Sequence, residues 1–184
     1  MKKNSILKYL KYFSVGFIIV LAVEVIDIAL FSSIIDLNLG IYNLNIITII
    51  FTSGFTSLEV MLEWLILFTI ICAFLILGTI MLILSFKKNL EEKLLIKFIL
   101  LIGLFFLISG LIKTFIIYLL GMSTIQYDST SITVQNAIYT ESITPFIGVI
   151  MWIYFWAVSM VILTSGLILG GVGLKSLLDN EGKK

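Results

Sequence analysis

Two carboxylates, Glu24 and Asp27, lie inside an apolar run that is long enough to cross a membrane. A charge at the centre of a bilayer costs about 2.5–3.5 kcal/mol on insertion scales, so it needs either a partner or a task. The two acids are three residues apart and therefore share one face of a helix. Acids in this setting can exchange a proton or a cation, or they can form an ion pair with a buried base.

The matching base is Lys113, the one basic residue inside the third apolar run. Asp27 follows Lys11 by 16 residues, and Lys113 follows Lys97 by 16. At about 1.5 Å per helical residue, both groups lie roughly 24 Å beyond the last lysine before their runs. We therefore predict that Asp27 pairs with Lys113. Glu24 would sit one turn deeper, either sharing Lys113 or protonated and hydrogen-bonded.

Four roles are open to this charge cluster of Glu24, Asp27 and Lys113. It can be a structural ion pair that fixes helix register, a proton or cation path, a contact with a partner subunit, or a catalytic centre. Glu59 and Glu63, one turn apart near the outer end of the second run, are predicted to form an acidic outer mouth above the pair.

The elements that hold these residues follow from composition. The chain of 184 residues is 60% hydrophobic and 12% charged, with a mean hydropathy of +1.19, whereas soluble domains are about 45–50% apolar and about 25% charged. Four apolar runs reach the roughly 20 residues that a span requires. They cover about residues 12–35, 60–86, 98–120 and 145–174. We predict an all-α membrane protein, a single four-transmembrane-helix bundle.

The basic residues predict the orientation of the bundle. All twelve are lysines, and apart from Lys113 they precede the first run, separate the second from the third, or follow the fourth. The segments 36–57 and 121–144 contain none. Because lysine-rich loops stay inside, both termini are expected to be cytoplasmic. The isoleucine- and lysine-rich, arginine-free composition is typical of a microorganism, which suggests its cell membrane.

The two outer segments are not typical short turns. Residues 40–57 have an apolar core too short to span, and residues 123–142 partly alternate polar with apolar residues; both are rich in β-branched side chains. This composition favours strands, and we expect a small extracytoplasmic β-sheet cap that joins the two segments. Irregular loops, or an interfacial or re-entrant helix in the first segment, are the alternatives.

Small and aromatic residues mark the fourth run. Gly166 and Gly170 are four residues apart, a spacing that lets two membrane helices approach closely. Packing inside the bundle is favoured over a dimer contact. Aromatic residues cluster at 151–158, and Trp and Tyr favour the membrane interface.

The sequence argues against an enzyme. It contains no histidine to act as a base or metal ligand, and its single cysteine, Cys72, lies in mid-run without an activating neighbour. No phosphate-binding loop, serine elbow or dinucleotide motif is present. We expect no cofactor, no metal and no nucleic-acid partner.

The expected role is therefore a non-enzymatic one in the lipid bilayer. We predict an accessory, assembly or structural subunit that contacts other membrane protein subunits. The alternative is a small channel or transporter subunit whose proton or cation path is lined by Glu24, Asp27 and Lys113.

Overall fold

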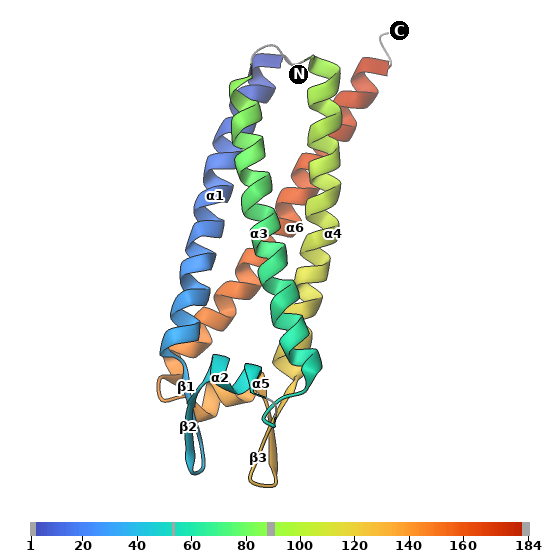
Figure 1. Ribbon diagram of the computed structural model, residues 1–184. Coiled ribbons are helices and arrows are strands. Elements are labelled where there is room, and N and C mark those ends of the chain that lie inside the picture. Colours follow the sequence, from blue (N-terminus) through green and yellow to red (C-terminus); the bar gives the residue numbers. More distant parts are fainter. Residues whose placement is uncertain (1–2, 53, 88–90, 182–184) are drawn as a thin grey trace. The chain divides into compact units, whose positions relative to one another are not determined.

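The computed structural model describes residues 3–52, 54–87 and 91–181, and long helices dominate it (Figure 1). Four of the described helices are long and apolar enough to cross a membrane, which confirms the four predicted runs. The first begins earlier than predicted, because lysine is a good helix former and the helix continues through Lys8 and Lys11. The helices are α1 (Lys3–Ile34), α3 (Leu58–Phe86), α4 (Glu92–Met122) and α6 (Pro145–Glu181).

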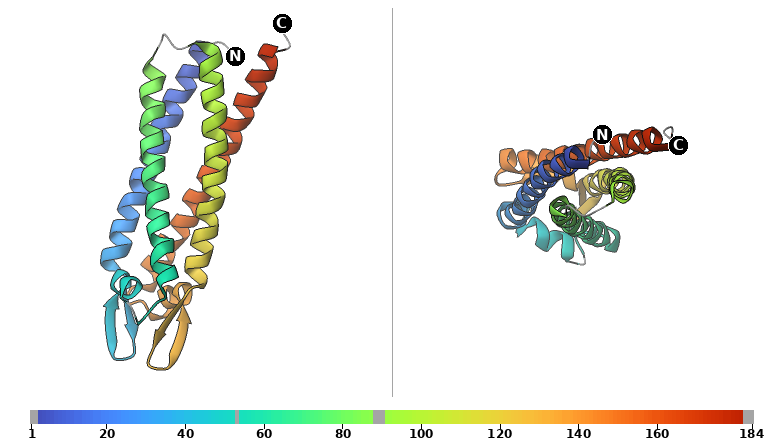
Figure 2. Two further views of the ribbon diagram at one scale, coloured as in Figure 1. Left: turned by 45° about the vertical axis from the view of Figure 1, so that its right-hand side comes forward. Right: turned by 90° about the horizontal axis from the view of Figure 1, so that it is seen from above.

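The segments 36–57 and 121–144 form short elements, and neither contains a further candidate span among the described residues. Their strands do not join in one sheet, so that prediction is wrong: each segment closes its own two-stranded antiparallel hairpin. Figures 1 and 2 show the hairpins side by side. The first segment contains β1 (Asp36–Leu39), β2 (Tyr42–Asn45) and α2 (Ile46–Phe51); the second contains β3 (Thr124–Tyr127), β4 (Thr130–Thr133), α5 (Val134–Asn136) and the π-helix η1 (Ala137–Glu141).

Contacts divide the chain into two compact units. Unit 1 comprises Met1–Ala22, Cys72–Ile112 and Val158–Lys184, and unit 2 comprises Val23–Ile71 and Lys113–Ala157. Each of the four long helices contributes residues to both units. The single-domain interpretation stays a prediction.

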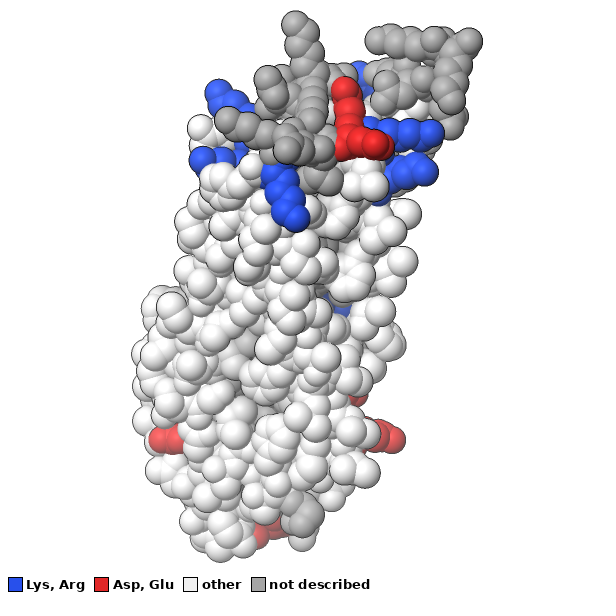
Figure 3. Space-filling view, turned by 45° about the horizontal axis from the view of Figure 1, so that its top comes forward, with Lys and Arg blue, Asp and Glu red and all other residues white. Residues whose placement is uncertain are grey.

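Unit 1 is built from helices alone. Phe17 of α1 stacks on Phe106 of α4 at 4.6 Å between ring centroids and meets the edge of Phe74 of α3 at 6.1 Å. The start of α1, the end of α6 and the adjoining ends of α3 and α4 lie at one end of the unit (Figure 1). Lysine side chains gather at this end (Figure 3). Of the lysines used for the topology prediction, Lys2, Lys88, Lys183 and Lys184 lie outside the described residues.

Unit 2 has an aromatic centre. The ring of Phe31, which is fully buried on α1, lies 6.0 Å from Trp64 of α3, 6.4 Å from Trp152 of α6 and 5.5 Å from Phe155 of α6. Buried aromatic pairs stabilise a core beyond the area that they bury. These four residues join three long helices beside the two hairpins.

The same succession of elements occurs twice in unit 2. Each copy has the end of a long helix, a hairpin of two four-residue strands with a two-residue turn, a short helical segment and the start of the next long helix; the segment is α2 in the first copy and α5 with η1 in the second. The registers coincide after a constant shift of 88 residues: Asp36 pairs with Asn45, and Thr124 with Thr133 (36 to 124, 45 to 133).

Backbone hydrogen bonds and buried side chains follow the same shift. The amide of Ile46 donates to the carbonyl of Ile35 at 2.9 Å, and the amide of Val134 donates to the carbonyl of Ser123 at 2.8 Å. Asn45 and Thr133 cap the two short helices with their side chains. Further counterparts that are buried in both copies are Leu37 and Ile125, Ile50 and Ile138, Trp64 and Trp152, and Leu67 and Phe155. Unit 2 therefore contains two copies of one structural repeat.

The two copies also bind each other reciprocally. The amide of Ile143, in the second copy, donates to the carbonyl of Asp36 in β1 at 3.0 Å. The amide of Gln126 in β3 donates to the carbonyl of Phe55, in the first copy, at 2.8 Å. The first strand of each hairpin thus bonds to the segment that follows the short helix of the other copy. This exchange resembles a two-fold contact between subunits.

Candidate functional site

A completely buried ion pair joins α1 and α4 in unit 2. The ammonium of Lys113 contacts the Oε1 atom of Glu24, and both side chains are 0% exposed. The structure thus brings together two residues that were predicted to belong to one cluster. The predicted pairing is wrong, however, because the partner of Lys113 is Glu24 and not Asp27.

The direction of helical side chains explains the difference. The Cα–Cβ bond of a helical residue tilts toward the helix N-terminus. The tilt affects the acids of α1 too, but the four-carbon side chain of Lys113 is longer than that of either acid, so its ammonium pairs with α1 one turn before Asp27. Counting residues gives the depth of a Cα atom, whereas the charge of a lysine lies several ångströms from it.

Asp27 lies beside this pair but outside it. The side chain is half-buried, and its Oδ2 atom is buried without a hydrogen-bond partner among the described residues. The Oε2 atom of Glu24 is likewise buried and unpartnered within the described part of the chain. An unsatisfied carboxylate oxygen in an apolar setting is costly. Lys113 pairs with Glu24 alone, so an ionised Asp27 has no compensating charge among the described residues of the cluster.

Tyr154 of α6 belongs to the surroundings of the cluster. Its phenol lies close enough to Glu24 and Asp27 for both carboxylates to act on it electrostatically. The sequence did not predict that Tyr154 lies beside the charge cluster, because it falls among the aromatic residues at 151–158 that were assigned to the membrane interface. No sequence signal could have found it, since a helix that is apolar on all sides does not show which face meets its neighbour.

The outer acids occupy the start of α3. Glu63 is partly buried, and its Oε2 atom accepts a hydrogen bond of 3.3 Å from the Ser123 hydroxyl, which follows α4. Glu59 is exposed in the first turn of α3, where the helix dipole favours an acid. Both belong to unit 2, as the ion pair does. Their role as an acidic outer mouth stays a prediction.

The predicted glycine contact lies between α4 and α6 in unit 1. A methyl group at Gly166 would lie 2.7 Å from the backbone nitrogen of Leu107 and 3.0 Å from the carbonyl oxygen of Gly103. A methyl group at Gly103 would lie 2.6 Å from the Cα atom of Gly170. Gly103, which sequence reasoning missed, is therefore as tightly enclosed as Gly166. At Gly170 itself nothing lies within 4 Å of an added methyl group.

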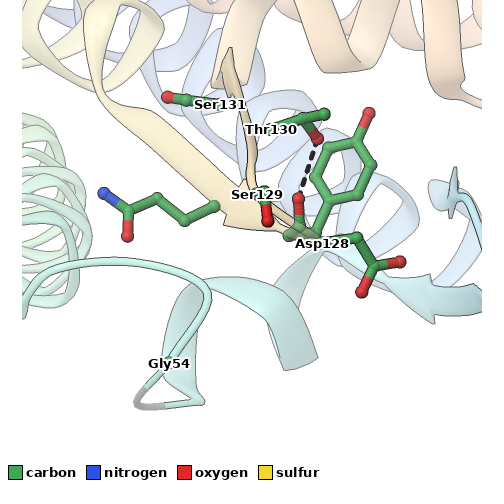
Figure 4. A pocket seen from close by; sticks show the side chains of 7 residues that line it. Gly54, Asp128, Ser129, Thr130 and Ser131 are labelled. Atoms are coloured by element: carbon green, nitrogen blue, oxygen red, sulfur yellow. Dashed lines mark hydrogen bonds between the residues drawn. The ribbon is translucent and has the colours of Figure 1, made fainter.

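A polar pocket opens on the second hairpin. It has a volume of about 400 Å³ and is lined by the turn residues Asp128 and Ser129 together with Thr130, Ser131 and Gly54 (Figure 4). The hydroxyl of Thr130 donates to the backbone carbonyl of Tyr127 at 2.8 Å. The two turn residues have positive φ angles of 41° and 67°. The pocket is an open surface depression, and it carries a single carboxylate.

No group of three or more potential metal ligands occurs in residues 3–52, 54–87 and 91–181. Comparisons with protein-family models, with curated proteins and with solved structures give no match. The charge cluster and the apolar helices that carry it are therefore the features that bear on function.

Proposed function

We propose that this chain is a non-enzymatic, multi-pass membrane protein that serves as an accessory, assembly or structural subunit of a membrane complex. Its four candidate spans have 29, 29, 31 and 34 residues, which is enough to cross the hydrocarbon core of a bilayer. Large apolar side chains are exposed along them, among them Leu101, Phe115 and Leu167. Such surfaces are suited to lipid or to other membrane proteins.

We place the protein in the cell membrane of a microorganism with both termini in the cytoplasm. The lysines outside the third span flank the same ends of the four spans, and the hairpin segments carry none. Lysine bias of this kind directs the lysine-rich side to the cytoplasm.

This orientation predicts the result of cysteine labelling. In a Cys72→Ser background, Ser131→Cys in the outer hairpin should react with an impermeant maleimide in intact cells. Asn180→Cys should react only after the membrane is permeabilised. The reverse pattern would contradict the orientation, and labelling of both positions in intact cells would contradict an even number of spans.

The observation that best supports a structural role is the full burial of both partners in the Glu24–Lys113 pair. A pair that is closed on itself and joins α1 to α4 fixes the register of two helices. Buried pairs specify an arrangement more reliably than they add stability. A subunit whose task is assembly needs such a fixed arrangement, and it needs no reactive group.

A second candidate is a channel or transporter subunit with a proton or cation path along Glu24, Asp27 and Lys113. The observation that favours it is the pair of buried carboxylate oxygens, Oε2 of Glu24 and Oδ2 of Asp27, that accept no hydrogen bond from the described residues. Intramembrane acids of this kind occur in proton relays.

Extraction in a mild detergent separates the two functions. For an accessory subunit we expect other membrane chains to co-purify in a fixed ratio, and Glu24→Gln to reduce the amount of assembled complex. A conduit would purify alone, and Glu24→Gln would change its cation or proton flux in liposomes at unchanged abundance. That second result would overturn the proposed accessory role.

A further inference from the structure

Asp27 lies in a row of residues that are exposed on the outer half of α1. Val23 is 45% exposed, Ile26 57% and Leu30 43%. Residues at these spacings share one helix face, which we call the Asp27 face (Val23, Ile26, Asp27, Leu30). Glu24, one turn earlier, is fully buried next to this face and pairs with Lys113. The chain thus presents a carboxylate at the edge of an otherwise apolar surface.

No group within the described chain satisfies this carboxylate. Asp27 forms no ion pair or hydrogen bond with the described residues, and one of its oxygens is buried. Lys113 is the only basic residue in the sequence ranges of unit 2, and Glu24 occupies it. With both acids ionised, the cluster of two acids and one base carries one uncompensated negative charge. In lipid, a cationic partner would offset the cost of such a charge.

The internal repeat supplies a control within the same molecule. The shift of 88 residues places Phe115 at the position of Asp27 and Tyr118 at that of Leu30 (27 to 115, 30 to 118). Phe115 is 60% exposed and Tyr118 51%. The second copy thus builds the same helix with large aromatic side chains on this face. The second copy forms this helix without an acid at that position, so the acid of the first copy is available for a contact outside the fold.

We propose that the Asp27 face binds a transmembrane helix of a partner protein that carries a lysine or arginine at the depth of Asp27. One basic side chain would bring the cluster to neutrality, and the apolar flanks would pack against the partner helix. A second copy of this chain is a poor occupant, because a two-fold contact through this face would bring Asp27 against Asp27. The inference rests on the proposed accessory role and names the chemistry of the partner.

Site-specific photo-crosslinking of the full chain in its native membrane tests this proposal. A photoreactive amino acid at Ile26 should capture a membrane protein with a lysine or arginine inside an apolar span. The same probe at Phe115, the counterpart of Asp27 in the second copy, should capture lipid only. Asp27→Leu should lower the yield from Ile26 by about tenfold or more, since one lost charge pair is worth at least that factor.

Charge exchange is the decisive arm. Asp27→Lys should abolish capture, and Asp27→Lys combined with an acid at the partner's basic position should restore it. Asp27→Asn, which keeps the shape of the side chain, should lose capture at normal abundance and so excludes misfolding as the cause. Capture of a second copy, capture of a chain without an intramembrane base, lipid adducts only, or insensitivity to Asp27→Leu would each overturn the inference.

The outcomes also separate this inference from the proposed function. Subunits that co-purify with wild-type protein and equally with Asp27→Leu would leave the accessory role standing and reject the Asp27 face. A chain that purifies alone under mild extraction would reject the accessory role itself.

Discussion

Lys113→Met alone is expected to cost about 3–5 kcal/mol of folding free energy and most of the folded protein. The substitution removes the ammonium and leaves the carboxylate of Glu24, which is 0% exposed, uncompensated inside unit 2. Met fills a similar volume, so the loss reports the missing charge more than a cavity. The measurement is the monodisperse fraction after detergent extraction, together with its thermal unfolding temperature.

Adding Glu24→Met to Lys113→Met should restore much of that loss. Replacing both members of a buried ion pair by apolar residues of similar size is often nearly neutral. Asp27→Leu is the matched control: added to Lys113→Met, it should restore little, because Glu24 would still be unpaired. Rescue by Asp27→Leu in place of Glu24→Met would contradict the pairing found in the structure. A double variant that folds but loses a measured flux would favour the conduit function.

The four long apolar helices could be predicted because their signal is local. Each is a run of apolar residues without internal proline, and in lipid only a helix satisfies every backbone group within such a segment. The charge cluster could be predicted for a related reason, since a charge in an apolar run is rare and has few possible partners. Which of the two acids, Glu24 or Asp27, pairs with Lys113 could not be predicted from the sequence. It depends on side-chain direction and on the rotation of α1 about its axis, and neither is written in the spacing of the charged residues.

The repeat could not be seen in the sequence because its two copies share environment more than identity. Leu37 and Ile125 are both buried, and so are Leu67 and Phe155, yet the residue types differ. Trp64 and Trp152 differ from these pairs, since they are buried and also share the same residue type. An apolar residue next to other apolar residues gives a weak signal of position, so a shift of 88 residues stands out only once the hairpin registers are known.

The prediction of a single β-sheet was wrong because each of the two segments is long enough to pair with itself. Each outer segment contains two four-residue strands and closes on itself through a two-residue turn, helped by Gly40 with a φ angle of 66° in the first hairpin. A local hairpin costs less loop entropy than pairing across more than 80 residues. The two segments still meet through the bridge between Leu37 and Ser142.

The aromatic residues at 151–158, which were assigned to the membrane interface, include Trp152 and Phe155, and these two pack on Phe31 in the core.

The effect of an added methyl group on the glycines between α4 and α6 should depend on what that methyl group would contact. Gly103→Ala and Gly166→Ala are expected to destabilise by about 1–3 kcal/mol each, because the methyl group would overlap the backbone of the facing helix and the helices would have to separate. Backbone atoms cannot move aside as the end of a flexible side chain can. Thermal unfolding of the detergent-solubilised protein measures the change.

Gly170→Ala and Gly171→Ala are the matched controls on the same helix. Nothing lies within 4 Å of a methyl group at either position, and alanine favours a helix over glycine by about 0.5–1 kcal/mol. Both should therefore keep or slightly raise stability, although the sequence pattern assigns Gly170 the same packing role as Gly166. Gly170 contributes its backbone, against which Gly103 rests, and that backbone survives the change to alanine. A loss at Gly170→Ala as large as that at Gly103→Ala would show that α4 and α6 meet through a different face.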